Sequence, residues 1–336
     1  MRTRKPERDK LLGYVDRFEG LRIGVWGDLI LDEHLYGTTR RISREAPVLI
    51  LTFLDQEYSL GGAGNAIQNL KALGAFPVPV GVVGRDAAGR KVLGLLSSKG
   101  VPTDRIIPEK AFRTPVKTRI MAGEENTRKQ QILRIDREGR VPDSAALTGR
   151  IRKAVGSVLR DCAALLVSDY SYDTVKEAIY AESLPEAAAA RVPVAVDSRF
   201  RLMDFAGATI ATPNESEVEA AFKAASGGKG ASLYEASAKV MRKLRSPALL
   251  VTRGSRGMVL FEKGRPPFPI PVRGTTDIVD VTGAGDTVIS VFTLALAAGA
   301  SFREAAELAN FAGGVVVMKK GAAALSPREL RQAILS

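Results

Sequence analysis

The sequence predicts an α/β protein in which a mostly parallel, doubly wound β-sheet is covered by helices on both faces. Short apolar runs with the length of buried strands alternate with segments of helical periodicity along most of the chain. This alternation favours parallel strands, because each return to the same edge of a sheet needs a crossover helix. Residues 1–336 are enough for one such domain with a small accessory element, and we expect a single domain.

The first strand is expected at residues 21–26, directly before Gly27. A helix is expected over residues 66–73, because apolar residues recur on one face and Gly74 ends the pattern. A second helix is expected at residues 89–99. The other predicted strands, in chain order, are 78–83, 163–168, 192–197, 208–212, 249–252 and 258–261.

Two segments interrupt the alternation, at about residues 35–60 and 112–137. They are rich in β-branched and polar residues and show little helical periodicity. Strands are expected within them at residues 48–53, 115–121 and 131–135. The two segments follow early strands of the main sheet, so they could pair into a small sheet that forms a lid over a site. The alternative is a pair of long surface hairpins.

The charge of the chain favours anionic ligands. Lys and Arg exceed Asp and Glu by 49 − 37 = 12. A positive field attracts sugar phosphates and nucleotides, and nucleic acid is the other candidate partner. The basic residues are scattered and are not interleaved with aromatic residues as in a groove for single strands. We therefore expect a solvated basic surface and no nucleic-acid partner.

Two singular residues limit the chemistry. Cys162 is the only cysteine, which excludes a disulfide framework and a cysteine-based metal site. His34 is the only histidine, which excludes a multi-histidine zinc site and argues against a Ser-His-Asp or Cys-His mechanism. Carboxylates, backbone dipoles or a metal carried by a ligand are the remaining means of catalysis.

We expect a cytoplasmic protein with no membrane partner, because the sequence shows neither a secretory signal nor a membrane-spanning stretch. The charged N-terminus has no apolar core of the kind found in secretory signals. The longest strongly apolar stretch, residues 288–300, is too short to cross a bilayer.

The strongest chemical signal is the string Asp280-Val-Thr-Gly-Ala-Gly-Asp-Thr287, which is followed by an apolar run typical of a buried helix. The N–H groups of Gly283, Ala284 and Gly285 would converge at the start of that helix, where free N–H groups and the helix dipole favour an anion. Asp286 beside this anion hole could take a proton from an attacking hydroxyl, for which an ordinary pKa suffices. The alternative is a glycine turn with Asp286 as a helix cap.

A nicotinamide-binding fingerprint is the competing interpretation of these glycines. That motif needs a third glycine three positions after the second. The position holds Val288 after Gly283 and Gly285, and Ile67 after Gly62 and Gly64. Neither string therefore matches a dinucleotide site.

Two further strings could bind a sugar. Gly61, Gly62 and Asn65 begin the first predicted helix, where the glycines let a ligand approach and Asn65 offers a donor and an acceptor. Asp28 follows the first strand, and ligands of open α/β sheets collect at the carboxyl ends of strands. Asp32 either shares its face or is solvated. Each string is also compatible with a plain turn or a helix cap.

A third string, Pro213-Asn-Glu-Ser-Glu217, follows the strand expected at 208–212. Asn214 and Glu217 could hold a phosphate-bound Mg²⁺ through water. An ordinary helix start explains the same residues equally well.

The order of these motifs resembles the ribokinase-like (PfkB) carbohydrate kinases over about residues 18–330. The resemblance implies a doubly wound domain with a small β-sheet lid, ATP and Mg²⁺ as cofactors, and a monovalent cation. Asp286 would be the base, and Gly283, Ala284 and Gly285 the anion hole. Sugar-binding positions would fall on Asp28, Gly61, Gly62 and Asn65. Nucleotide positions would fall on Asn214, Thr252, Gly254, Gly257 and Asn310, the last near the adenine, with Glu217 at the metal through water.

A closer likeness is to the D-glycero-D-manno-heptose-7-phosphate kinases, the kinase domain of ADP-heptose synthase. The strings that carry it are Gly27–Asp32, Arg41–Pro47, Gln130–Asp136 and Asp280–Thr287. One string departs, because Ser168-Asp-Tyr-Ser-Tyr-Asp173 lacks the Lys-Gly of the subfamily pattern Asp-Tyr-x-Lys-Gly. The likeness implies phosphorylation of heptose 7-phosphate to the 1,7-bisphosphate. A kinase for another sugar or nucleoside, or a non-catalytic sugar- or nucleic-acid-binding relative, is the alternative.

An acceptor that carries a phosphate would need cations far from Asp286. We expect the pair Arg119 and Arg44 to supply them, since arginine binds phosphate through two hydrogen bonds. The lid should also form a homodimer, because its edges and apolar residues would otherwise be exposed. The other candidate cations are Arg41, Lys117, Arg134 and Arg199, and the apolar lid residues are Val48, Ile50, Leu51, Ile120 and Met121.

Overall fold

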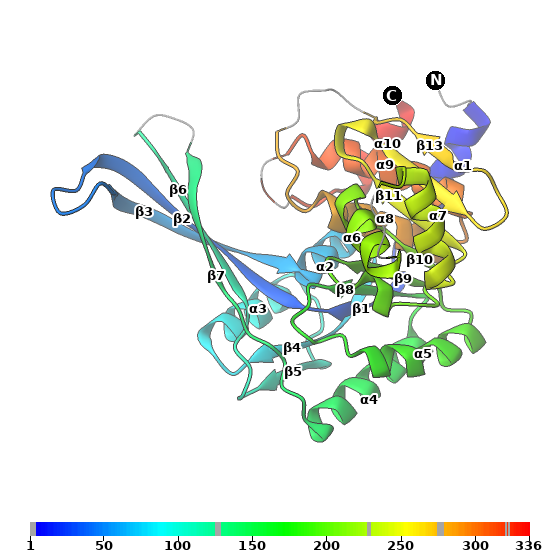
Figure 1. Cartoon of the computed structure of the whole chain (residues 1–336), viewed down its shortest axis with the longest axis horizontal. Coiled ribbons are helices and arrows are strands. Elements are labelled where there is room, and N and C mark those ends of the chain that lie inside the picture. The colour runs from blue at the N-terminus through cyan, green and yellow to red at the C-terminus, as the bar shows by residue number, and fades with distance from the viewer. Residues whose placement is uncertain (1–4, 125–128, 227–229, 274–278, 320, 322) are drawn as a thin grey trace.

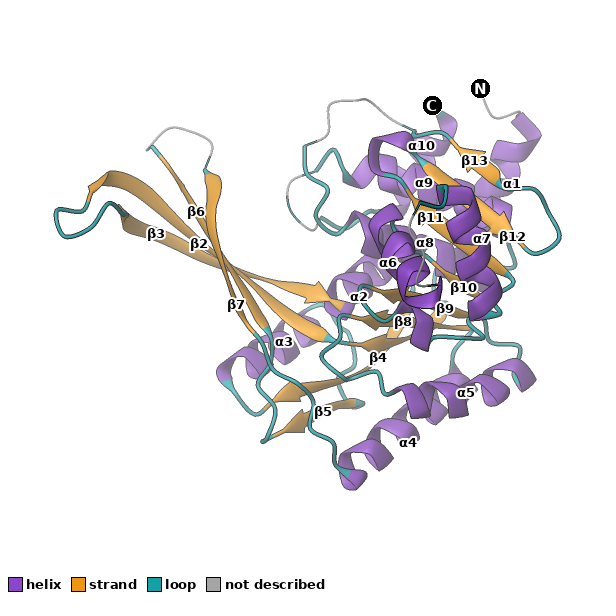
Figure 2. Ribbon diagram, viewed as in Figure 1, coloured by secondary structure: helices purple, strands orange, loops and turns teal. Residues whose placement is uncertain are grey.

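The computed structural model describes residues 5–124, 129–226, 230–273, 279–319, 321 and 323–336. Within these residues the main sheet has nine strands in the order β13-β12-β11-β10-β9-β8-β1-β4-β5 (Figure 2). The strands of the main sheet are β1 (Arg22–Gly27), β4 (Phe76–Gly84), β5 (Ile106–Glu109), β8 (Ala164–Asp169), β9 (Val194–Ser198), β10 (Ile210–Ala211), β11 (Ala248–Thr252), β12 (Met258–Glu262) and β13 (Phe268–Ile270).

Helices cover both faces of this sheet, as the alternation of the sequence predicts. One apolar core layer joins the sheet to α1, α2, α3, α8, α9 and α10, and the other joins it to α4, α5, α6 and α7. The helices are α1 (Lys5–Asp16), α2 (Ala63–Ala72), α3 (Ala87–Ser98), α4 (Ala145–Asp161), α5 (Glu177–Ala189), α6 (Glu215–Ser226), α7 (Leu233–Leu244), α8 (Ala284–Ala297), α9 (Phe302–Val316) and α10 (Pro327–Leu335). No described helix is both long and apolar enough to cross a membrane.

Most neighbouring strands of the main sheet are parallel, which confirms the expected class. The exception is one edge, where β12 runs antiparallel to β11 and β13 runs antiparallel to β12. A short turn of residues 253–257 joins β11 to β12, and a turn of that length can only bring the chain back antiparallel. The strand expected at 208–212 shortens to β10, and the sequence pattern did not reveal β5 or β13.

The two interrupting segments form a separate four-stranded sheet, in the order β3-β2-β6-β7. Its strands are β2 (Leu29–Ile42), β3 (Leu49–Gly62), β6 (Val116–Gly123) and β7 (Gln130–Arg137). This lid projects away from the main body (Figure 1). Its first strand begins at Leu29 and not near residue 35, because β2 follows β1 with only Asp28 between them. The hairpins β2–β3 and β6–β7 are therefore not separate surface hairpins, since β2 also pairs with β6 and joins them into one sheet.

Strand pairing gives the lid two chemically different faces. Asp32 lies beside Lys117, and His34 beside Arg119, in alternate rows of β2 and β6. The row between these two joins Glu33 to Thr118, and the row after that of His34 is apolar and joins Leu35 to Ile120. Side chains of successive residues in a strand point to opposite faces, so the rows of Asp32 and His34 face one way and the rows of Glu33 and Leu35 face the other. Leu133 of β7 extends the apolar row, and Arg134 extends the row of His34.

Gly27 shows how closely the main sheet is packed where it leads to the lid. A Cβ atom at this position would lie 2.2 Å from the carbonyl oxygen of Ser168 and 2.9 Å from Cβ of Ala63. The first contact is to backbone of the neighbouring strand β8, so no side-chain rotation can relieve it. Only glycine allows β1 to end this close to β8.

We expect Gly27→Ala to lower the free energy of unfolding by about 1–3 kcal/mol, because the added methyl group forces apart backbone that is already in contact. Urea unfolding followed by circular dichroism measures the change. Gly94→Ala is the matched control, since Gly94 lies exposed in α3 and a Cβ there meets nothing within 4 Å. That variant should gain about 0.5–1 kcal/mol from helix propensity. Equal unfolding midpoints for Gly27→Ala and the parent would show that β1 can move away from β8.

Candidate active site

Asp286 lies in the first turn of α8, as the motif predicts. Gly283 caps this helix with φ of 77°, a left-handed conformation that favours glycine, and Ala284 and Gly285 follow as its first residues. The Asp286 side chain is only 6% exposed. The backbone N–H groups at this helix start and the Asp286 carboxylate are therefore brought together at one point.

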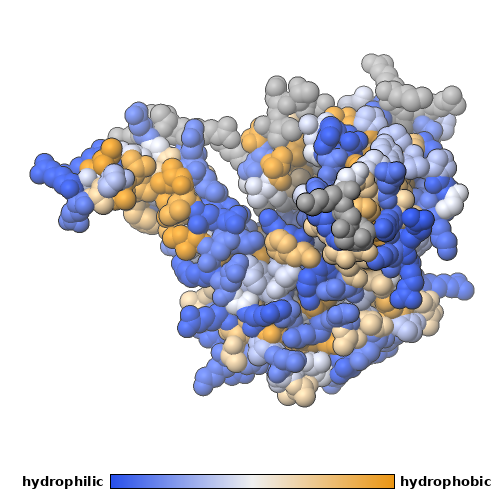
Figure 3. All heavy atoms as spheres, in the orientation of Figure 1, coloured by the Kyte–Doolittle hydropathy of each residue, from blue (hydrophilic) through white to orange (hydrophobic). Residues whose placement is uncertain are grey.

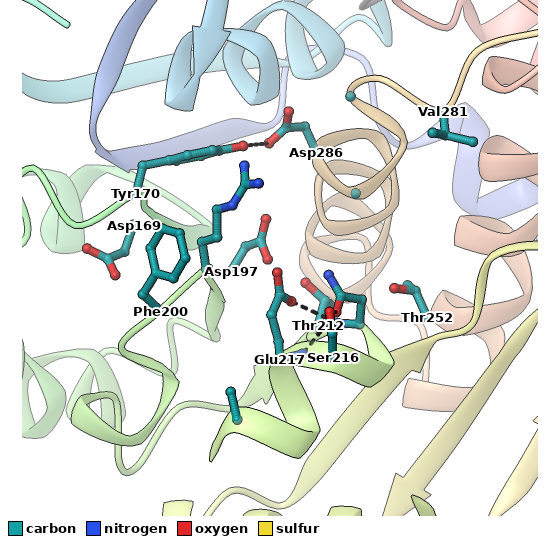
Figure 4. Close-up of a pocket in the computed structure, with 15 residues that line it drawn as sticks. Asp169, Tyr170, Asp197, Phe200, Thr212, Ser216, Glu217, Thr252, Val281 and Asp286 are labelled. Carbon is teal, nitrogen blue, oxygen red and sulfur yellow. Dashed lines mark hydrogen bonds between the residues drawn. The ribbon is translucent and has the colours of Figure 1, made fainter. Parts of the chain in front are cut away.

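Two side chains hold the Asp286 carboxylate from opposite sides. Asn65 of α2 donates from Nδ2 to Oδ2 at 2.7 Å. Tyr170, which follows β8, donates its hydroxyl to Oδ1 at 3.3 Å, as Figure 4 shows. Burial raises the pKa of Asp286 to about 6, while the hydrogen bonds from Asn65 and Tyr170 oppose the increase. The pKa is therefore higher than the ordinary value that would suffice for a base, because the carboxyl group is removed from water.

Two cavities meet at Asp286. The larger has a volume of about 630 Å³ and the smaller about 190 Å³, and Asp286, Gly283, Tyr170 and Arg199 line both. A group bound in one cavity could therefore reach a group bound in the other across the Asp286 carboxylate. Figure 4 shows Asp286 and Tyr170 on one side of the larger cavity, with Thr212, Ser216, Glu217 and Thr252 on another.

The smaller cavity brings together three residues of the predicted sugar site. Gly61, Gly62 and Asn65 line it, together with Asp32 of β2. Cβ at position 61 would lie 2.6 Å from Oδ2 of Asp32, so a side chain here would displace the Asp32 carboxylate. Oδ1 of Asn65 is buried and has no hydrogen-bond partner among the described groups. Such an acceptor is suited to a hydroxyl group of a ligand.

Asp28 does not line the smaller cavity, although we expected it to bind the sugar. It is 1% exposed, and its carboxylate accepts the backbone N–H groups of Tyr170 at 2.7 Å, Tyr172 at 3.1 Å and Thr174 at 3.2 Å. Burial, with the nearby charge of Asp169, raises the pKa of Asp28 to about 6. Because its oxygens are used inside the protein, Asp32 and not Asp28 presents a carboxylate to the smaller cavity.

The larger cavity contains part of the predicted nucleotide site. Asn214, Glu217 and Thr252 line it. Asn214 and Glu217 also cap α6 reciprocally, because Asn214 Oδ1 accepts the Glu217 N–H at 2.9 Å and Glu217 Oε2 accepts the Asn214 N–H at 2.8 Å. The string therefore starts a helix, as one interpretation predicts, and the same two side chains line the larger cavity, while the bound Mg²⁺ of the other interpretation stays a prediction.

Three residues of the predicted nucleotide site, Gly254, Gly257 and Asn310, are not among the described residues that line the larger cavity. Their contacts lie near the edge of the main sheet formed by β11, β12 and β13. Gly254 has φ of 56° and begins a single 3-10 turn, and Gly257, with φ of 79°, lies so close to β13 that a Cβ would be 2.2 Å from the Ile270 carbonyl. Asn310 of α9 donates from Nδ2 to the Pro271 carbonyl at 2.8 Å. In this structure their contacts are structural.

The structure assembles a different set of cations from the pair that we expected. Lys117, Arg119 and Arg199 line the smaller cavity, and Arg119 pairs with Asp32 at 2.6 Å. Arg44 lies in the loop between β2 and β3, at the end of the lid far from the main sheet (Figure 1). Burial, with the charge of Arg199, lowers the pKa of Lys117, as expected for a cation among other cations.

Sequence reasoning missed two residues of this site. Tyr170 belongs to the string Ser168–Asp173, in which we noted only that Lys-Gly is absent. Nothing in that string predicts that the Tyr170 hydroxyl contacts Asp286. Asp197 lies near the end of β9 and lines the larger cavity. Burial, then the charges of Asp286 and Glu217, hold the pKa of Asp197 well above its usual range. The rule that ligands collect at carboxyl ends of strands could have identified Asp197.

Solved structures share this fold. The structure of Arabidopsis thaliana ribokinase complexed with ribose and ATP superposes with a TM-score of 0.68 at 20% identity, over 94% of this chain and 99% of that one. The phosphofructokinase-2 of Escherichia coli in complex with potassium gives a TM-score of 0.71 at 16% identity, over 94% and 98%. At these identities the likeness shows a ribokinase-like fold.

Sequence relatives show the family. The bifunctional protein HldE of Pelobacter propionicus is 37% identical over 329 residues, which are 98% of this chain and 66% of that protein. The HldE protein of Geobacter metallireducens is 40% identical over 311 residues, or 91% and 61%. The chain thus spans just under two thirds of the length of these relatives. A family model described as pfkB family carbohydrate kinase matches residues 23–329. The chain therefore belongs to the pfkB family and is a carbohydrate kinase.

Proposed function

We propose that the chain transfers the γ-phosphoryl group of Mg-ATP to a hydroxyl of a sugar phosphate, with Asp286 as the base. The observation that carries this proposal is the position of the Asp286 carboxylate, which is buried at a helix N-terminus where two cavities meet. ATP would occupy the larger cavity and the acceptor the smaller one.

In the proposed reaction the acceptor hydroxyl oxygen forms a bond to the γ-phosphorus while the bond from that phosphorus to the β–γ bridging oxygen breaks. Asp286 takes the hydroxyl proton, and ADP leaves with the electron pair of the broken bond. The N–H groups of Gly283, Ala284 and Gly285 would stabilise negative charge on the phosphoryl oxygens. A base whose pKa is about 6 is mostly ionised at neutral pH, as this role requires.

The acidic residues of the larger cavity support a metal there. Asp197 and Glu217 line it, and the negative charge of Glu217 helps to raise the pKa of Asp197. A cation relieves such repulsion, so these carboxylates would hold Mg²⁺, through water in the case of Glu217, with Asn214 and Thr252 beside the nucleotide. The bound Mg²⁺ would neutralise charge on the ATP phosphates. The monovalent cation stays a prediction.

Asp286→Asn tests the base directly. The amide keeps the shape of the side chain but cannot accept the proton, so kcat should fall by about 10²–10⁴ while the Kd for Mg-ATP stays within about twofold. A coupled ADP assay measures kcat, and isothermal titration measures Kd. A kcat equal to that of the parent would refute the role of Asp286.

We propose heptose 7-phosphate as the acceptor and the 1,7-bisphosphate as the product, which is the reaction of the kinases that the sequence strings resemble. We expected the cations to lie far from Asp286, but Lys117 and Arg199 line the smaller cavity together with Asp286, and there they could meet the acceptor's phosphate. Arg119 of the same cavity is partly neutralised by Asp32. Asp32 and the unpartnered Oδ1 of Asn65 are suited to its hydroxyl groups.

Lys117→Ala tests whether the acceptor's phosphate binds here. Loss of a charge-assisted contact should raise KM for the phosphorylated sugar by about tenfold or more, and should change KM for the unphosphorylated sugar much less. Arg44→Ala is the matched control and should leave the ratio of the two KM values unchanged. If Arg44→Ala changes the ratio and Lys117→Ala does not, Arg44 and Arg119 would be the better assignment.

We also propose that the chain forms a homodimer through the apolar face of the lid. Phe53, Leu133 and Ile135 are 64%, 53% and 46% exposed. Figure 3 shows apolar side chains gathered on the lid, in contrast to the largely hydrophilic surface around them. Pairing two lids about a twofold axis would bury this surface.

A charge on the apolar face should separate the two subunits. We expect the double variant Phe53→Asp/Leu133→Asp to have a monomeric mass by light scattering at micromolar concentration, where the parent is a dimer. Gln131→Asp is the control, because a register shift between Ile120 and Met121 interrupts the alternation of β7. The shift places Gln131 opposite Met121 and Tyr36, in a row that faces away from the row of Leu35 and Leu133. A monomeric parent, or a double variant that stays dimeric, would contradict the proposed interface.

A further inference from the structure

The loop that follows β8 has an unusual backbone. Ser171 and Asp173 have φ of 66° and 67°, in the left-handed region that residues other than glycine rarely adopt. Residues of alternating handedness turn alternate N–H groups to the same side, and such a concave arrangement binds an anion. Here the anion is internal, since the N–H groups of Tyr170, Tyr172 and Thr174 all point to the Asp28 carboxylate.

The same loop contains the departure from the Asp-Tyr-x-Lys-Gly string, with Tyr172 and Asp173 in place of Lys and Gly. Asp173 has the positive φ at the position that the string gives to glycine, and aspartate is among the residues that tolerate it best. Its carboxylate pairs with Arg140 and with Arg201, the latter at 3.6 Å. Two ion pairs of Asp173 therefore help to hold the loop in this conformation.

The consequence of this conformation is the position of Tyr170. Its hydroxyl reaches Oδ1 of Asp286, and Nζ of Lys117 lies 5.2 Å from the centre of its ring. Burial raises the pKa of Tyr170 well above its ordinary value, so the phenol keeps its proton and acts as a donor. Nothing else in the proposed reaction uses this hydroxyl.

We propose that Tyr170 is a positioning residue for the Asp286 base, and that Asp28 keeps Tyr170 in place through the loop 170–174. The inference rests on the proposed function, because it gives Tyr170 a role only if Asp286 is the base. Asn65 fixes one carboxylate oxygen and Tyr170 fixes the other, so the plane of the carboxylate is set. Each oxygen keeps a second lone pair, which can accept the hydroxyl of the acceptor.

A pH profile separates positioning from a purely structural role. The hydrogen bond from Tyr170 stabilises the ionised form of Asp286, so its loss should raise the pKa of the base. Among the described residues, the other charged groups around Asp286 are carboxylates and cations of the two cavities, and the substitution leaves all of them in place. They are Asp32 of β2, Lys117 and Arg119 of β6, Asp169 of β8, Asp197 of β9, Arg199 directly after β9, and Glu217 of α6.

We expect Tyr170→Phe to lower kcat by about tenfold, the usual scale for one hydrogen bond to a charged group. The acidic limb of its pH–rate profile should move to higher pH by about one unit. KM for ATP should stay unchanged. Tyr172→Phe is the matched control in the same loop, because the Tyr172 hydroxyl lies 3.5 Å from Glu138 and has no contact with Asp286. Comparison of variants on one substrate cancels the titration of the substrate's own phosphate.

Asp28→Asn tests the second half of the inference. The amide offers one acceptor oxygen in place of two, so at least one loop N–H loses its partner and the position of Tyr170 relaxes. The kcat loss and the shift of the acidic limb should resemble those of Tyr170→Phe. In the double variant Asp28→Asn/Tyr170→Phe the two effects should not add, since both act through one hydrogen bond. Additive effects would overturn the role of Asp28.

The outcomes distinguish this inference from the proposed function. An active Asp286→Asn variant would refute the proposed function whatever Tyr170→Phe does. If Asp286→Asn is inactive while Tyr170→Phe keeps the kcat and the acidic limb of the parent, only the inference is overturned. If Asp28→Asn does not fold, the comparison of Tyr170→Phe with Tyr172→Phe still decides the role of Tyr170.

Discussion

The packing of α2 against α8 is the constraint on which the site depends. Three polar contacts join the two helices: Asn65 to Asp286, Thr287 to Asn69 at 3.1 Å, and Ser290 to the Ala66 carbonyl at 3.3 Å. The surrounding residues are apolar and buried, so each contact satisfies groups that would otherwise be costly to bury. The glycine-rich start of α2 and the late motif at α8 are thus parts of one structure, although 221 residues separate Asn65 from Asp286.

The same packing determines the electrostatics. Removal of Asp286 from water favours its neutral form, and donors from α2 and from the loop after β8 restore part of the stability of the charged form. The balance leaves a carboxylate that ionises near pH 6 between two cavities. The larger cavity has an excess of carboxylates and the smaller one an excess of cations, although Arg199 lines both and Asp32 lines the smaller. Such a division suits one ligand that brings a metal and another that brings a negative charge.

The fold class and the central motif could be predicted because short stretches of neighbouring residues determine them. Alternating strands and helices predicted the parallel sheet, and the Asp280–Thr287 string predicted a helix start with Asp286 in its first turn. The assignment of Asp28 was different, since Asp28 and Asp32 are four residues apart and equally polar. Only the junction of β1 and β2 decides that one carboxylate turns inward to a loop and the other faces a cavity.

The other features that the sequence did not predict are contacts between residues that lie far apart in the chain. Tyr170 meets Asp286 across 116 residues, and no local pattern around Tyr170 indicates this partner. The cations of the smaller cavity depend on the register of β2 with β6, which places Lys117 and Arg119 on the face of Asp32, while Arg44 is carried to the far end of the lid. Register between distant strands is fixed by tertiary packing, and a single sequence does not display it.

The most direct test of this account is a ¹³C NMR titration of the aspartate carboxyl groups in the free protein, with the Asp286 resonance assigned by its absence in Asp286→Asn. The account predicts that this carboxyl titrates at about pH 6, because burial outweighs the two donors that stabilise its charge. Titration near the ordinary aspartate value of about 3.9 would show that the carboxylate is solvated, and would contradict the burial of the base between α2 and α8.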